Sequence, residues 1–199
     1  MGIRSNITFL AIFITAMVLL AVVTIGGKST TAPPTINQEI KKPSECSGIT
    51  TPQQTEGPYY KVGSPQRNNI AQNLPGEKIV ITGFVFDKNC QPIPSVWLDF
   101  WQADSKGVYD NSGYNLRGHQ YTDASGRYQL ETIIPSAYER RPPHIHVKIK
   151  APDGIILTSQ MYFPNESLNK TDSIFNPALT MEVTHTSDGK EAKFNFVLP

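Results

Sequence analysis

Two histidines, His144 and His146, are separated by one residue within the largely apolar segment 144–150. Side chains two residues apart on a β-strand point to the same face, so the two imidazoles are expected to project side by side. Imidazoles placed in this way suit two ligands of one metal ion. A pair of this kind, taken alone, is more often a pair of structural histidines on a half-buried sheet face. The residues upstream therefore decide between the two interpretations.

Two tyrosines precede the histidine pair. Tyr138 lies six residues before His144, and Tyr109 follows the apolar segment 96–103. Phenolate oxygen is a hard, strongly donating ligand that prefers a trivalent ion, whereas zinc more often takes cysteine and histidine. Two tyrosines together with two histidines therefore favour Fe(III). The alternative is copper or zinc on the histidines alone, with both tyrosines in packing roles.

The motifs around these residues resemble the intradiol ring-cleavage dioxygenases, in particular the short, exported, protocatechuate 3,4-dioxygenase-like branch of that family. They occur in order over residues 45–199, and all of them are short combinations of glycine, proline, aromatic and polar residues. They are Thr-Glu-Gly-Pro-Tyr-Tyr at 55–60, Trp-Gln-Ala at 101–103, Gly-Val-Tyr at 107–109, Leu-Arg-Gly at 116–118, Tyr-Thr-Asp at 121–123, Gly-Arg-Tyr at 126–128, Thr-Ile-Ile-Pro at 132–135, the segment 138–146, and Gln-Met-Tyr-Phe-Pro at 160–164.

The resemblance implies a ligand set and a reaction. Tyr109, Tyr138, His144 and His146 would hold Fe(III), which acts as a Lewis acid on a bound catechol. Tyr138 would leave the metal and take one catechol proton, while Tyr109 stays bound. Reaction with O2 would then cut the ring between the two hydroxylated carbons and give a muconate-type diacid.

The resemblance also implies roles for residues beside the metal. Arg141 matches an active-site arginine, whose fixed charge would stabilise negative charge that develops on the ring. Gln160 matches a glutamine that would hydrogen-bond an oxygen species. Tyr59 and Tyr60 lie in a segment that crosses the active site in this family, and they are candidates for contact with the substrate.

The link between Tyr138 and His144 is shorter than in the well-known aromatic-degrading members of the family. The missing residues would normally contact the substrate, so a more open pocket is expected and the particular catechol stays open. A second class of function is a binding module, a β-sandwich that keeps these motifs without catalysis. Loss of any ligand would favour that class, and all four candidate ligands are present.

The segments that must position these residues read as short strands with alternating or continuous apolar character. Predicted strands cover residues 78–86, 96–103, 127–134, 144–150, 155–163 and 190–198, and a loop covers 107–126. Sixteen prolines and fourteen glycines add frequent turns. The sequence therefore predicts an all-β fold, a single β-sandwich domain with long active-site loops, preceded by an N-terminal hydrophobic helix.

The N-terminal part has a different composition. Residues 1–27 read as a signal peptide or transmembrane anchor, residues 28–44 as a flexible linker, and residues 45–199 as the domain. The domain is therefore expected outside the cytoplasm, anchored or secreted, with membrane contact through the N-terminal segment alone. Cys46 and Cys90 are expected to form a disulfide in that compartment. A net charge of +1 gives no sign of a nucleic-acid partner, and the oligomeric state stays open.

Overall fold

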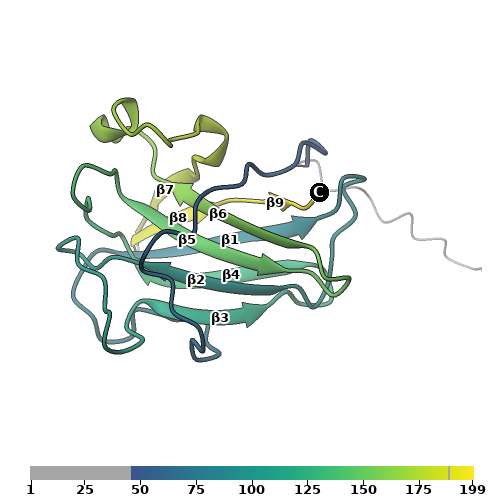
Figure 1. Cartoon of the computed structure of the whole chain (residues 1–199), viewed down its shortest axis with the longest axis horizontal. Coiled ribbons are helices and arrows are strands. Elements are labelled where there is room, and N and C mark those ends of the chain that lie inside the picture. The colour runs from purple at the N-terminus through teal and green to yellow at the C-terminus, as the bar shows by residue number, and fades with distance from the viewer. Residues whose placement is uncertain (1–45, 188) are drawn as a thin grey trace, which may run out of the picture. The chain divides into compact units, whose positions relative to one another are not determined.

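The computed structural model describes residues 46–187 and 189–199. These residues form two β-sheets and two short 3-10 helices (Figure 1). Within this part of the chain, no helix is long and apolar enough to cross a membrane. The predicted N-terminal helix, the signal or anchor (1–27) and the linker (28–44) lie outside the described residues and stay predictions.

The first sheet has four antiparallel strands in the order β3-β2-β5-β6. Its strands are β2 (Trp97–Gln102), β3 (Arg117–Tyr121), β5 (His144–Lys150) and β6 (Ile156–Tyr162). The histidine strand β5 pairs with β2 on one side and β6 on the other. It is therefore an inner strand, which fixes the direction of its side chains.

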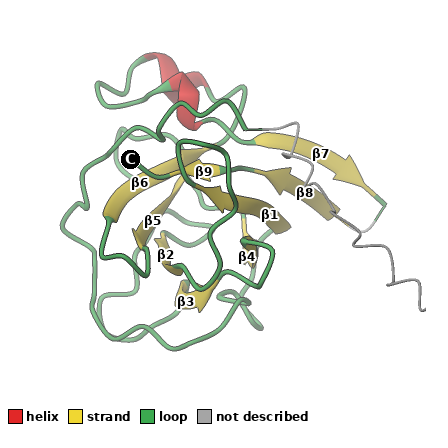
Figure 2. Ribbon diagram, turned by 90° about the vertical axis from the view of Figure 1, so that its right-hand side faces the viewer, coloured by secondary structure: helices red, strands yellow, loops and turns green. Residues whose placement is uncertain are grey.

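The second sheet has five strands, with the order β4-β1-β8-β7 and with β9 also paired to β1. Its strands are β1 (Lys78–Phe86), β4 (Arg127–Ile133), β7 (Glu182–Thr186), β8 (Gly189–Lys193) and β9 (Phe196–Val197). The 3-10 helices η1 (Ser167–Lys170) and η2 (Pro177–Leu179) lie in the connection from β6 to β7. Figure 2 shows the two sheets as separate layers, which confirms the predicted all-β fold for the described residues.

The hydrophobic core fills the space between the sheets. Leu98 and Phe100 of β2, Ile145 and Val147 of β5, and Ile81 of β1 are all 0% exposed and belong to one core cluster. Because side chains alternate along a strand, His144 and His146, which flank Ile145, point the other way. The two histidines of β5 are therefore on the outer face of the four-stranded sheet.

The segment 51–67, called the arm below, covers that outer face, and it is drawn in dark blue in Figure 1. The main-chain nitrogen of Gln54 donates to Thr158 in β6, and that of Arg67 donates to His119 in β3, each at 2.9 Å. The arm thus runs across the sheet from one edge strand to the other. It helps to bury the histidines, whose exposed fractions are only 4% each.

The predicted disulfide joins Cys46 to Cys90, which are 44 residues apart in sequence. It anchors the chain just before the arm begins. Thr51 adds a second attachment, since its main-chain nitrogen donates to Val197 at 2.9 Å and its hydroxyl accepts from the same residue at 2.9 Å. The start of the arm is therefore fixed to the sandwich by both covalent and hydrogen bonds.

The predicted strands agree with the structure to within one residue at each end for β1, β2, β4, β5 and β6. The last predicted strand (190–198) is divided into β8 and β9, because the side chain of Asn195 accepts the hydrogen bond of the Phe84 main-chain nitrogen at 2.9 Å. The predicted loop 107–126 was wrong in part, since it contains β3, and β7 was not predicted. Both are mainly polar edge strands, which lack the apolar alternation that indicates a strand.

Candidate active site

The site is built on β5, where His144 and His146 share the outer face of the sheet as their spacing predicts. His146 stands opposite Trp101 of β2, and their rings stack with centroids 4.8 Å apart and planes 11° from parallel. The His144 ring lies 4.8 Å from the His146 ring, at an interplanar angle of 66°. The stacking on Trp101 fixes the orientation of His146 on this face.

The two imidazoles direct their Nε2 atoms toward each other, at a distance of 3.1 Å. The Nδ1–H group of His144 donates to the Pro142 carbonyl at 2.7 Å, so its Nε2 carries the lone pair of the ring. Burial, and then the nearby Arg141, lower the pKa of His144 to about 4, and burial lowers the pKa of His146 well below its usual value. Both side chains are therefore neutral at pH 7, which is the form that binds metals.

Tyr109 brings a phenol oxygen to the same point. Its hydroxyl lies 3.5 Å from Nε2 of His144, and its side chain is buried. Burial raises its pKa to about 12, although Arg141 and Arg117 act in the opposite direction. An adjacent cation would therefore be needed to ionise this phenol near neutral pH.

The loop that carries Tyr109 lies directly against the segment before Tyr138 because of Gly107. At this position φ is +78°, and a Cβ atom would lie 2.3 Å from the Ala137 carbonyl oxygen. Only glycine combines this backbone conformation with this close approach. The side chain of Asp104 fixes the same turn by accepting the main-chain hydrogens of Lys106 and Val108. The Gly-Val-Tyr motif thus brings the two tyrosines together.

Tyr138 stands beside this cluster, but its hydroxyl turns to other partners. Its ring meets the Tyr109 ring edge-on at 5.4 Å, while its hydroxyl contacts the hydroxyl of Tyr59 and donates to the Glu139 carboxylate at 2.7 Å. These two hydrogen bonds are the main reason that the pKa of Tyr138 is raised. The structure therefore brings Tyr109, His144 and His146 together and places Tyr138 alongside them.

The two tyrosines of the arm have different positions. Tyr59 stacks on Tyr109, with centroids 4.4 Å apart and planes 8° from parallel, so it forms a wall of the site. Tyr60 packs on Trp101 at 4.9 Å, beneath the ammonium group of Lys148 at 4.4 Å. Burial, together with the nearby Asp99, raises the Tyr60 pKa to about 12. Tyr59 is therefore the better placed of the two for contact with a substrate.

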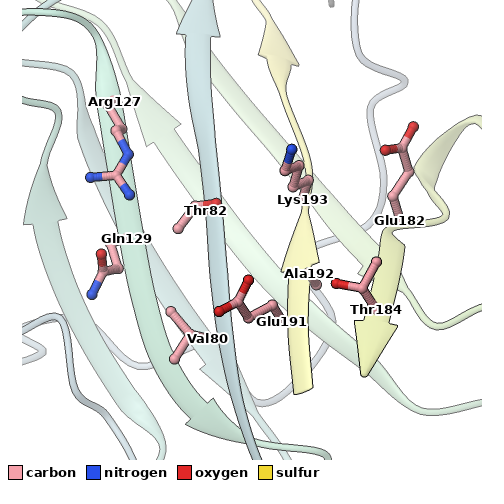
Figure 3. Close-up of a pocket in the computed structure, with 9 residues that line it drawn as sticks. All are labelled: Val80, Thr82, Arg127, Gln129, Glu182, Thr184, Glu191, Ala192 and Lys193. Carbon is pink, nitrogen blue, oxygen red and sulfur yellow. The ribbon is translucent and has the colours of Figure 1, made fainter. Parts of the chain in front are cut away.

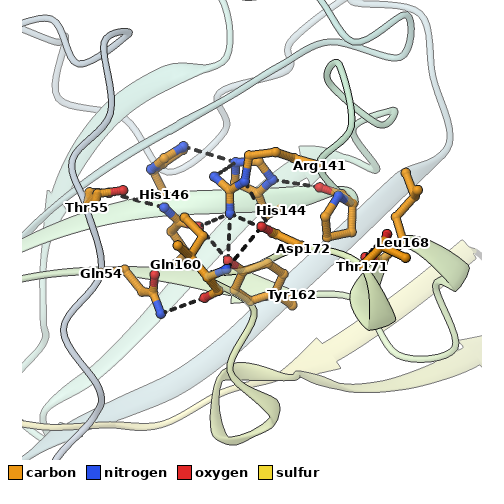
Figure 4. A network of polar contacts seen from close by, with 12 residues as sticks. Gln54, Thr55, Arg141, His144, His146, Gln160, Tyr162, Leu168, Thr171 and Asp172 are labelled. Carbon is orange, nitrogen blue, oxygen red and sulfur yellow. Dashed lines mark hydrogen bonds and ion pairs between the residues drawn. The ribbon is translucent and has the colours of Figure 1, made fainter.

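Arg141 approaches the cluster from the side of β6, as Figure 4 shows. Its Nη1 lies 3.1 Å from Nε2 of His144. Its Nη2 donates to Gln160 at 2.8 Å and to Tyr162 at 2.7 Å, and it pairs with Asp172 at 3.0 Å. The predicted cation is thus at the site, adjacent to the nitrogens that converge there.

Gln160 is fully buried, and both the oxygen and the nitrogen of its amide group form hydrogen bonds within the protein. Its oxygen accepts from Arg141 and from Tyr162, and its nitrogen donates to the Thr55 carbonyl at 3.1 Å. The predicted contact between Gln160 and an oxygen species stays a prediction. In the structure the residue lies against Arg141 and joins it to the arm.

Four residues of the site were not found from the sequence: Glu139, Tyr162 and Asp172 in the network above, and Arg117. Arg117 is buried, and its Nη1 donates to the main-chain oxygen of Tyr59 at 2.6 Å, which fixes the arm over the cluster. Tyr162 could have been found, because it stands two residues after Gln160 and so shares its face of β6. Asp172 and Glu139 lie in loops without a periodic signal.

Within the described part of the chain, no three histidine, cysteine, aspartate or glutamate side chains come together in a way that could hold a metal ion. The further side-chain donor that the structure brings to the two histidines is the phenol oxygen of Tyr109. The donor set fits such an ion, because two buried, neutral imidazole nitrogens and one phenol oxygen already converge, and a second phenol stands next to them.

A separate hollow of about 330 Å³ lies on the other sheet, where residues of β1, β4, β7 and β8 point outward (Figure 3). It is lined by Val80, Thr82, Arg127, Gln129, Glu182, Thr184, Glu191, Ala192 and Lys193. None of these is among the candidate catalytic residues. Since the core lies between the two sheets, this hollow has no part in the chemistry of the β5 face.

Known proteins are similar to this chain in sequence and in fold. A family model described as Dioxygenase matches residues 55–199. The dioxygenase domain of a dioxygenase carbohydrate-binding protein fusion from Streptomyces sp. SirexAA-E is 48% identical, with a TM-score of 0.73 over 75% of this chain and 98% of that chain. The 3-chlorocatechol 1,2-dioxygenase from Rhodococcus opacus 1CP is 28% identical, with a TM-score of 0.69 over 74% of this chain and 72% of that chain.

Among curated proteins, the protocatechuate 3,4-dioxygenase beta chain of Burkholderia cepacia is 36% identical over 128 residues, which are 55% of this chain and 54% of that protein. The chain spans about half the length of the curated relatives it matches. The family match covers the arm from residue 55 onward, both tyrosine loops, the histidine strand and β6. The chain belongs to the intradiol ring-cleavage dioxygenase family.

Proposed function

We propose that this protein is a non-haem Fe(III) dioxygenase that cleaves catechol-type rings between their two hydroxylated carbons. The reaction adds both atoms of O2 to the catechol and gives a muconate-type diacid. The observation that carries the proposal is the convergence of the Tyr109 oxygen and the Nε2 atoms of His144 and His146, with Tyr138 beside them.

The four residues Tyr109, Tyr138, His144 and His146 would hold the iron. Ferric iron, when bound, supplies a Lewis acid that withdraws electron density from a catecholate and prepares its ring for O2. The histidines suit this role because their lowered pKa values keep them neutral. The burial of Tyr109 keeps water away from its oxygen, which strengthens its interaction with a cation.

Tyr138 is the candidate for accepting a catechol proton. Its phenol has a position away from the three convergent atoms, where the Tyr59 hydroxyl and the Glu139 carboxylate hold it. A tyrosine that leaves the metal for this position could take up the substrate proton and donate it in a hydrogen bond to the Glu139 carboxylate. The raised pKa of Tyr138 in this position favours the protonated phenol.

Arg141 would stabilise the negative charge that develops on the ring during attack by O2. Its Nη1 lies next to the metal-facing nitrogen of His144, so the charge is placed before the reaction begins. Preorganised charges of this kind typically account for a factor of about 10² to 10³ in rate. The ring of Tyr59, which is stacked on Tyr109, would form an apolar wall for a flat aromatic substrate.

The relatives suggest which substrates to try, since proteins named for catechol, hydroxyquinol and protocatechuate are all among them. Oxygen uptake by the iron-loaded full-length protein, with each compound in turn, tests the proposal. We expect one O2 consumed per ring and a diacid product with two ¹⁸O atoms after reaction with ¹⁸O2. Binding of catechols with no oxygen uptake would instead support the non-catalytic binding module.

Tyr138→Phe is the most informative variant for this assay. It keeps the ring contact with Tyr109 but removes the oxygen, so we expect a change of colour in the ferric protein and a large loss of turnover. Tyr121→Phe is the matched control, because Tyr121 is 50% exposed on β3 and has no part in the cluster. Equal activity of the two variants would contradict the assigned role of Tyr138.

We also propose that the domain works outside the cytoplasm, as a secreted or membrane-anchored protein. The Cys46–Cys90 disulfide supports this, because such bonds persist in oxidising compartments. Protease digestion of intact cells that express the full chain tests it. Degradation of the domain under these conditions supports the proposal, and full protection until the cells are lysed contradicts it.

A further inference from the structure

The protein holds Arg141 through one edge of its guanidinium group, the edge formed by Nε and Nη2. This determines the direction of the remaining nitrogen, Nη1. Its Nε and Nη2 atoms face Asp172 at 3.2 and 3.0 Å, and Nη2 also donates to Tyr162 and Gln160. Nη1, in contrast, faces His144. A guanidinium group is a rigid planar fork, so fixing the Nε–Nη2 edge also fixes the direction of Nη1.

Asp172 supplies the negative charge that pairs with the guanidinium group of Arg141. Its side chain is 5% exposed and that of Arg141 is 22% exposed, so solvent screens the pair only weakly. The other carboxylate oxygen, Oδ1, accepts the main-chain hydrogen of Ile174 at 3.3 Å. Asp172 therefore attaches the arginine to the β6–β7 connection, and each of its two oxygens has a separate task.

The connection that carries Asp172 is itself anchored on both sides of the site. The Phe175 ring meets the Tyr162 ring edge-on at 5.1 Å, and the Ile174 carbonyl accepts from the side chain of Gln54 in the arm at 3.0 Å. The main-chain nitrogen of Asp172 donates to the carbonyl of Leu168 in η1 at 3.0 Å. Asp172 thus has little freedom to move away from Arg141.

We propose that Asp172 is a positioning residue for the reaction, which aims Nη1 of Arg141 at the metal-facing nitrogen of His144. Tyr162 assists by accepting from Nη2 and donating to Gln160 at 2.7 Å, which links two of the acceptors of Nη2 to each other. The inference rests on the proposed function, since it assigns Asp172 its effect through Arg141. If Asp172 only held the β6–β7 connection in place, its removal would not change the orientation of Arg141.

The variant Asp172→Asn removes the charge while it keeps the shape of the side chain. We expect kcat to fall by about 10- to 100-fold with little change in KM, since small displacements of a catalytic group have effects of this size. All rates are divided by the amount of bound iron, read from the ferric absorption band. Glu166→Gln is the matched control, because it removes a carboxylate from the same connection, and we expect wild-type kinetics from it.

A double-mutant cycle with Arg141→Gln then separates positioning from general damage. If Asp172 acts through Arg141, the loss caused by Asp172→Asn should nearly vanish in the Arg141→Gln background. If the fold-losses of kcat in the two single variants multiply in the double variant, the proposal is overturned. Tyr162→Phe provides a second variant that keeps the buried ring, and its smaller loss of kcat should likewise vanish in that background.

A measurement without turnover tests the contact directly. In the metal-free protein, the Nε–H resonance of Arg141 can be assigned by its absence in Arg141→Gln and followed by ¹⁵N NMR. We expect a slowly exchanging signal in wild type and Glu166→Gln, and its loss or shift in Asp172→Asn. An unchanged signal would refute the clamp itself, whereas a wild-type protein without a ferric band or oxygen uptake would refute the proposed function.

Discussion

Acidification of the metal-free protein should reveal the buried, neutral state of His144. Burial lowers the pKa of this residue to about 4, while an unfolded chain titrates it near its usual value of 6.5. Well above pH 6.5 both states are neutral and His144 contributes no pH dependence. As the pH falls below 6.5 the unfolded state binds the proton first, so stability is lost progressively until about pH 4.

The size of this loss follows from the two pKa values. At pH 5 the unfolded imidazole is almost fully protonated and the folded one is not, which costs about 2 kcal/mol of unfolding free energy. His146 acts in the same direction, since its pKa is also lowered by burial. The variant His144→Asn removes the contribution of His144 and leaves that of His146. Most carboxylates stay ionised between pH 7 and pH 5, so they add little to the pH dependence in this range.

Urea unfolding of the metal-free wild type and of His144→Asn, each at pH 7 and at pH 5, provides the assay. We expect the loss of stability between these pH values to be about 2 kcal/mol larger in wild type than in the variant. A comparison within each protein removes any general destabilisation that the substitution causes. Equal losses in the two proteins would show that His144 is not held neutral in the folded state.

Three further results are expected from urea unfolding at pH 7. Cys46→Ser with Cys90→Ser opens a loop of 44 residues and should lower the unfolding free energy by about 4 kcal/mol, so a change below about 1 kcal/mol would contradict the bond's stabilising role. Gly83→Ala places a Cβ atom 1.7 Å from the Phe194 carbonyl oxygen, which should cost about 3 kcal/mol or more unless the backbone can yield. Leu98→Ala empties a position that is 0% exposed, and we expect a loss of about 2 to 5 kcal/mol, whereas a near-neutral effect would refute its place in the core.

The parts of the fold that the sequence predicted are those in which apolar periodicity is strong. Strand β5 was predicted with its correct bounds, because Ile145, Val147 and Ile149 alternate with polar residues and all three are buried. The same alternation predicted that His144 and His146 share a face. Strand β3 was not predicted, because its sequence Arg-Gly-His-Gln-Tyr has no apolar alternation and is typical of a loop. It lies at the edge of its sheet.

The sequence predicted the residues of the candidate site but not its geometry. The residue types and their order indicated Tyr109, Tyr138 and the two histidines, yet nothing in the sequence indicates that the Tyr138 hydroxyl turns to Tyr59 and Glu139. The contact between the hydroxyls of Tyr59 and Tyr138 joins residues that are 79 positions apart in the chain. Contacts of such long range depend on how the loops are folded, and local patterns do not contain this information.

The partners of Arg141 show the same limit. The arginine was predicted from its position before His144, but Asp172 lies 31 residues further along, in an irregular connection with no motif of its own. Burial makes the difference, because this carboxylate is 5% exposed while most loop aspartates are solvated. The structure was therefore needed to find the carboxylate that pairs with Arg141.

The visible spectrum of the ferric full-length protein tests the central claim most directly. Tyrosinate bound to ferric iron gives a broad ligand-to-metal charge-transfer band and a reddish colour, and catechol added under nitrogen should shift that band. We expect Tyr109→Phe to abolish or strongly weaken the band, and Tyr121→Phe to leave it unchanged. A protein that folds normally, stays colourless with ferric iron and does not respond to catechol would contradict the iron–tyrosinate site on which the proposed function depends.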